Sequence, residues 1–116
     1  MKTEYRIKKS QDFKKVLDYR GLAGKSEIAS VYFAPNEIDH AHIGISVSTK
    51  VGNAVVRARV RRQVRAIINL TDVLNQPYDI VIIVHKGFLN KTFQENEESL
   101  SSFFNRLKQK ALKEKK

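Results

Sequence analysis

The segment from Lys50 to Arg65, KVGNAVVRARVRRQVR, decides most of what the sequence predicts about the fold. Asn53 is a good N-cap residue, so we expect a helix from Ala54 to about Leu70. Because a helix turns by about 100° per residue, apolar side chains at the right spacing gather on one narrow face. These side chains are Val56, Val60, Val64 and Ile67, with Ile68 at the edge of the face. We expect this face to pack on a sheet.

The rest of this helix surface carries five arginines and no acid. Arg57, Arg61 and Arg65 form an i, i+4, i+8 row beside the apolar face, and Arg59 and Arg62 cover the far side. Like charges at this spacing repel one another, so something outside the segment must compensate. Guanidinium groups bind phosphate bidentately and stack on bases, which favours a nucleic acid over incidental surface charge. A membrane-surface helix is disfavoured, because its apolar face would carry Trp, Phe or Leu.

Strands are expected on both sides of the arginine-rich helix. Residues 42–48 (HIGISVS) alternate between apolar and small or polar residues, which indicates a strand with two different faces. Residues 79–84 (DIVIIV) form a β-branched run, typical of a central strand buried on both faces. Strand, helix and strand make a βαβ unit, so the two strands should be parallel.

The remaining elements complete the predicted architecture. An amphipathic helix is expected over residues 11–19, with Ser10 as its N-cap, and strands are expected over 28–34 and near 22–26. Thr92 to Glu95 has the form of a capping box and begins a long C-terminal helix. We therefore predict an α/β (α+β) sandwich in which a small mixed four-stranded sheet is combined with three helices, in the order αβββαβα.

The composition narrows the class of protein. The 116 residues fit one domain, residues 1–116, with 22 Lys and Arg against 12 Asp and Glu, a net charge of +10. The chain has no Cys, which excludes disulfides, a thiol nucleophile and a Cys-based zinc site. The longest apolar run, Ile80 to Val84, is far too short for a membrane span. We expect no secretory signal, because the first ten residues contain no apolar segment. We expect a small, soluble cytoplasmic protein whose partner is nucleic acid and not a membrane.

No catalytic constellation appears in the sequence. There is no Ser/His/Asp arrangement, no pair of carboxylates at a glycine-rich turn and no cluster of metal ligands, so we predict no catalytic residue and no metal site. His40 and His42 indicate surface polarity more than zinc, since a third ligand is missing. His85 follows the predicted central strand, where it is either hydrogen-bonded within the protein or in contact with RNA.

The arginine-rich segment also resembles the signature of the bacterial ribonuclease P protein subunit, K-x-G-N-A-V-x-R-N-x-x-K-R-x-x-R. The matching positions are Lys50, Gly52, Asn53, Ala54, Val55, Arg57, Arg62 and Arg65. Residues 5–17 and the two strands that flank the helix also resemble the family, and Arg61 keeps the charge of its usual Lys. Two positions depart from the pattern: Ala58 replaces an asparagine, and Leu17 stands where relatives often have an aromatic.

The resemblance implies a function in tRNA maturation. Ribonuclease P is an endonuclease that removes the 5′ leader from precursor tRNA. Its RNA subunit performs the chemistry with bound Mg²⁺, and the small protein binds that RNA and the leader. No cofactor on the protein and no protein partner are expected. The family's βαβ crossover is left-handed, an exception to the usual rule.

The resemblance and the residue patterns together give two sets of candidate contacts. The residues expected on the catalytic RNA are Lys50, Asn53, Arg57, Arg59, Arg61, Arg62 and Arg65. The residues expected on the single-stranded leader are Phe13, Leu17, Ser30, Tyr32, Ser46 and Ser48. Phe13 is equally well explained as a core residue. The rival hypotheses are a ribosomal or other structural RNA-binding protein on the same scaffold, and an RNA enzyme that acts alone.

Overall fold

The elements follow the order expected from the sequence. The structure is a computed structural model that describes residues 5–7, 10–19, 23–36, 38 and 40–114. Its helices and strands are α1 (Ser10–Asp18), β1 (Ala23–Lys25), β2 (Ala29–Pro35), β3 (His42–Val47), α2 (Ala54–Asn69), β4 (Tyr78–Val84) and α3 (Phe93–Glu114). Two short 3₁₀ helices that were not predicted, η2 (Val73–Asn75) and η3 (Lys86–Asn90), flank β4.

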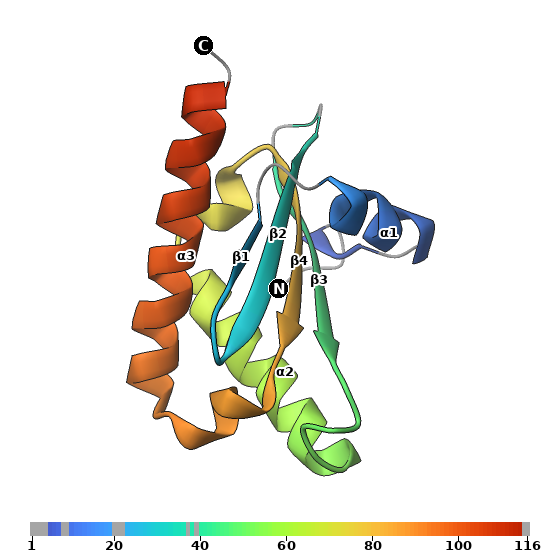
Figure 1. The fold of residues 1–116 in the computed structure, drawn as a ribbon, viewed down its shortest axis with the longest axis vertical. Coiled ribbons are helices and arrows are strands. Elements are labelled where there is room, and N and C mark those ends of the chain that lie inside the picture. The colour runs from blue at the N-terminus through green and yellow to red at the C-terminus, as the bar shows by residue number, and fades with distance from the viewer. Residues whose placement is uncertain (1–4, 8–9, 20–22, 37, 39, 115–116) are drawn as a thin grey trace.

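The four strands form one mixed sheet in the order β1-β2-β4-β3 (Figure 1). β1 pairs with β2 and β2 with β4 in antiparallel fashion, while β3 and β4 are parallel. The predicted βαβ unit is confirmed, because α2 connects the parallel strands β3 and β4. β4 lies between β2 and β3, which confirms its predicted place as a central strand.

Helices α2 and α3 pack on one face of the sheet and form the main core with it. From α2, Val60, Val64 and Ile67 are buried as predicted. Ile68, expected at the edge, is fully buried, while Val56 is only partly buried. The reason is that the first turn of α2 extends beyond the ends of the strands, and only its later turns lie against the sheet (Figure 1).

Helix α1 packs on the opposite face, which we call the α1 face. Val16 is 1% exposed and anchors α1, which contacts β2 and β4. The ring of Phe13 lies against Gly44, where an added Cβ would overlap the ring, so glycine is required for this close approach. β4 was predicted to be buried on both faces, yet Ile83 is half-exposed, because α1 lies near the start of β3 and leaves the other half uncovered (Figure 1).

The boundaries differ from the predicted ones by small amounts. Ser10 is itself the first residue of α1 and not a cap before it. The short strand expected near 22–26 is β1, although Leu22 lies outside the described residues. Within the described ranges, no helix is both long enough and apolar enough to cross a membrane.

Candidate nucleic-acid interface

The turn before α2 fixes where the arginine-rich helix begins. Asn53 is extended (φ −72°, ψ 179°), and its Oδ1 accepts a hydrogen bond from the backbone N of Val56 at 3.0 Å, which confirms it as the N-cap. A Cβ at Gly52 would clash with the Val56 side chain, so glycine lets the chain approach the helix closely. Lys50 is exposed in this turn. The cap uses only the amide oxygen of Asn53, so its NH₂ group remains available to a ligand.

The arginines of α2 have no acidic partner among the described residues. Arg59 and Arg62 are exposed, whereas Arg57, Arg61 and Arg65 are half-buried. The ion pairs of the described chain involve other cations only. The Nε atoms of Arg57 and Arg65 are buried and make no hydrogen bond. Unsatisfied buried donors are unfavourable, so these two Nε atoms cost the free protein some stability. What α2 offers an anionic ligand is the charge of five arginines that pair with no acid of the described chain.

A third arginine joins two of these from the N-terminal segment. Ile7 donates its backbone N–H to the carbonyl of Ile43 at 3.1 Å, and this bond holds Arg6 at the edge of β3. Arg6, Arg61 and Arg65 line a hollow of about 210 Å³. Burial and the charges of Arg6 and Arg61 lower the pKa of Arg65. Three cations around one hollow favour an anion there, and guanidinium groups can bind a phosphate bidentately.

Arg6 was not singled out from the sequence. It lies 55 positions before Arg61 in the chain, and no local pattern links the two. Only the pairing of the N-terminal segment with β3 brings it beside α2. A general excess of basic residues near the N-terminus was the only signal that could have drawn attention to it.

The leader-binding candidates fall on the α1 face in successive rows across the sheet. Tyr32, Val81 and Gly44 form one row, and Phe13 lies on it. Ser30, Ile83 and Ser46 form the next row, in which Ser46 is exposed, Ile83 is half-buried and Ser30 is buried. The alternation of strand side chains therefore places the candidates of β2 and β3 on one surface, as predicted.

The candidates on this surface differ in their exposure. Ser46 and Ser48 are exposed, while Tyr32, Phe13 and Leu17 are half-buried. Phe13 thus packs on the sheet and also keeps part of its ring accessible. Ser30 is only 4% exposed, and its Oγ lies 2.8 Å from Nε2 of His85 in a hydrogen bond.

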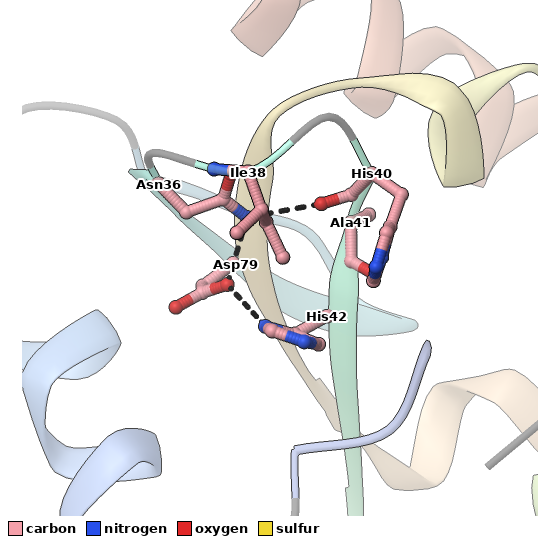
Figure 2. Close-up of polar contacts among 6 residues, drawn as sticks. All are labelled: Asn36, Ile38, His40, Ala41, His42 and Asp79. Atoms are coloured by element: carbon pink, nitrogen blue, oxygen red, sulfur yellow. Dashed lines mark hydrogen bonds and ion pairs between the residues drawn. The ribbon is translucent and has the colours of Figure 1, made fainter. Parts of the chain in front are cut away.

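The start of β3 carries a polar network that includes two histidines (Figure 2). Asp79 accepts hydrogen bonds from Nδ1 of His42 at 3.1 Å and from Nδ2 of Asn36 at 3.0 Å. The same Nδ2 donates to the carbonyl of His40, whose ring packs edge-on against Tyr5. The network ties the loop before β3 to β4. No group of three or more His, Asp or Glu in the described ranges could hold a metal ion.

Comparisons with known proteins agree with this geometry. A match to the Ribonuclease P family spans residues 1–108. The ribonuclease P protein component of Bacillus mycoides (strain KBAB4) is 39% identical over 115 residues, which cover 97% of this chain and 99% of the relative. That of Streptococcus agalactiae serotype III (strain NEM316) is 36% identical over 100 residues, covering 86% of this chain and 91% of the relative.

Solved structures give the same result at the level of the fold. The Staphylococcus aureus RNase P protein, solved as a mutant with defective mRNA degradation activity, superposes with a TM-score of 0.80 at 32% identity. The match covers 90% of this chain and 89% of that one. The likeness therefore includes the sheet, its strand order and the three helices.

Proposed function

This chain belongs to the ribonuclease P protein family, and on that premise we propose that it binds the ribonuclease P RNA through α2 and the 5′ leader of precursor tRNA on the α1 face. It acts as the protein subunit of an endoribonuclease that produces the mature 5′ end of tRNA. The observation that carries the proposal is the row of α2 arginines without acidic partners in the described chain.

The RNA subunit is proposed to contact α2 and the turn before it. Arg59 and Arg62 are exposed and reach phosphates freely, while Arg57, Arg61 and Arg65 stand beside the sheet. These three side chains are partly buried, with the Nε atoms of Arg57 and Arg65 inside the protein, so packing restrains them and positions several charges at once. Such contacts fix the orientation of the RNA and carry little sequence information. Lys50 and the NH₂ group of Asn53 extend the same surface at the start of the helix.

The leader is proposed to lie along the α1 face. Single-stranded RNA is bound by stacking on aromatic rings together with attraction of its phosphates. Phe13 and Tyr32 are half-buried aromatic residues that would stack on bases, and the small residues Ser46 and Ser48 are exposed. Leu17 adds apolar contact in place of an aromatic ring.

The chemistry is assigned to the RNA. The described residues offer no cluster of acidic or histidine ligands, so we place Mg²⁺ mainly on the RNA subunit and no catalytic residue on this chain. The protein's part is to lower the electrostatic cost of bringing two polyanions together. A ribosomal or other structural RNA-binding role would use the same arginines, but the family match favours the first function.

Reconstitution tests the proposal. The protein is mixed with bacterial ribonuclease P RNA and precursor tRNA at low Mg²⁺, and the rate of leader removal is compared with that of the RNA alone. We expect a clear enhancement, which diminishes as Mg²⁺ is raised because the metal then screens the phosphates itself. A rate equal to that of the RNA alone would refute the proposed function.

A further inference from the structure

The Ser30–His85 pair lies on the α1 face toward the C-terminal end of β4, with Ser30 buried and His85 half-buried. Ser30 belongs to β2, and His85 directly follows β4. The backbone N of His85 donates to the carbonyl of Ile28 at 2.8 Å, and its own carbonyl accepts from Phe88 at 3.1 Å. Both the backbone and one ring nitrogen of His85 are therefore held in place. An imidazole fixed in this way is pre-organised for a contact on its other side.

The hydrogen bond determines which ring nitrogen carries the proton. Ser30 is buried, and the described chain offers its hydroxyl no hydrogen-bond partner besides Nε2 of His85. A buried hydroxyl hydrogen left without an acceptor would be costly, so we assign it to Nε2. In a neutral imidazole, the proton then resides on Nδ1. Nδ1 becomes a hydrogen-bond donor with a fixed direction.

Nδ1 of His85 has no partner of its own in the described chain. It forms no hydrogen bond there, and the His85 side chain as a whole is only half-buried. His85 follows the end of β4, two residues beyond Ile83 of the row that also holds Ser30 and Ser46. Lys25, which pairs with Ser30 across the sheet, adds an exposed cation on the same side.

We propose that His85 binds the sugar–phosphate backbone of a leader nucleotide through Nδ1–H, and that Ser30 is the positioning residue that orients its ring. The inference rests on the proposed function. It extends the proposed leader-binding surface to a residue pair near the C-terminal end of β4. Ser30 acts from beneath the surface, and His85 makes the contact. A phosphate or ribose oxygen accepts such a donor without regard to base, so the contact suits leaders of any sequence.

The test measures affinity of the reconstituted holoenzyme for precursor tRNAs whose leaders grow from one to about ten nucleotides. With long leaders, His85→Ala should bind about fivefold more weakly than the natural protein, as expected for one hydrogen bond. With the shortest leader the two should be equal. His85→Asn, which keeps a donor near the position of Nδ1, should retain part of the affinity, while His85→Gln should not.

The Ser30→Ala variant tests whether Ser30 orients the His85 ring or only contributes to the stability of the fold. We expect about two- to threefold weaker binding of long leaders, and no additional loss when His85→Ala is combined with it. Nitrogen NMR of the free protein should report Nδ1–H in the natural chain and a shift toward the other tautomer in Ser30→Ala. His40→Ala, at the far end of the sheet, is the matched control and should not change the dependence on leader length.

The possible outcomes separate a failure of the proposed His85 contact from a failure of the proposed ribonuclease P function. If the natural protein fails to bind ribonuclease P RNA or to enhance cleavage, the proposed function is wrong. If it does both and His85→Ala follows the natural protein at every leader length, only the role of His85 is wrong. An Nε2–H tautomer in the natural protein would remove the positioning role from Ser30.

Discussion

Helices α2 and α3 pack on the same face of the sheet but differ in how their charges are partnered. On α3, Nζ of Lys108 pairs with Asp72 at 3.2 Å, and the guanidinium of Arg106 lies 4.7 Å from the ring centre of Phe103. On α2, no carboxylate of the described chain pairs with any arginine. α3 thus partners Arg106 and Lys108 within the protein, whereas the arginines of α2 have no acidic partner in the described chain.

The two helices are anchored equally well. Val64 of α2 and Leu100 of α3 are both 0% exposed in the core. The arginines are therefore not needed to hold α2 on the sheet, and their mutual repulsion works slightly against the helix. Exposed ion pairs such as that of Lys108 contribute little to stability, so the difference between the helices concerns binding more than folding.

Removing two cations from each helix should give the largest contrast. Arg61→Ala combined with Arg65→Ala should lower the salt slope of binding to ribonuclease P RNA by roughly 1.4–1.8 and weaken binding about 10- to 100-fold near 0.1 M salt. Binding across a salt series measures both. Arg106→Ala combined with Lys108→Ala changes the net charge equally and should have a much smaller effect. Equal losses in the two variants would mean that net charge, and not placement on α2, governs binding.

The N-terminal caps of α3 and α2 use different side chains but should stabilise the protein by similar amounts at neutral pH. Thr92 and Glu95 form the reciprocal capping box of α3, with bonds of 2.9 and 3.1 Å, whereas α2 is capped by the amide of Asn53. Thr92→Ala and Asn53→Ala should each lower the free energy of unfolding by about 1 kcal/mol at neutral pH. Denaturant unfolding measures this loss, and RNA binding should fall only for Asn53→Ala.

The hydrogen bonds from Thr92 lower the pKa of Glu95 below its ordinary value of 4.5. A carboxylate with a lowered folded-state pKa stabilises the protein above the unfolded-state pKa, and this contribution disappears as the pH falls below about 4.5. Glu95→Gln should therefore reduce the loss of stability on acidification, while Asn53→Ala should not, because an amide does not titrate. Identical acid profiles for Glu95→Gln and the natural protein would contradict this account.

The smallest effect is expected at Ala58, which is exposed on α2. Ala58→Asn should reduce the free energy of unfolding by roughly 0.5 kcal/mol through lower helix propensity. RNA binding should be equal or tighter, because the new amide can donate and accept hydrogen bonds beside the arginines. Titration against ribonuclease P RNA measures the change. A marked loss of affinity would show that residue 58 does not face the RNA.

Local patterns predicted the elements and the main surface. The spacing of Val60, Val64 and Ile67 located the buried face of α2, and alternation in β3 placed Ser46 on the opposite side from the core. These predictions succeed because helical and strand periodicities are properties of neighbouring residues. Burial at the ends of elements was less predictable, as Val56 and Ile68 show, since it depends on where the helix overlaps the sheet.

Local sequence accounts for the basic charge, the arginine-rich helix with its Asn53 cap and the order of strands and helices, because each is encoded within a few consecutive residues. Only the tertiary structure brought Arg6 beside Arg61 and Arg65, and joined Ser30 to His85 across 55 positions of the chain. Strand pairing decides such contacts, and it depends on register between distant segments. Two of the charges that the sequence placed on α2 thus line a hollow that Arg6, from the N-terminal segment, completes.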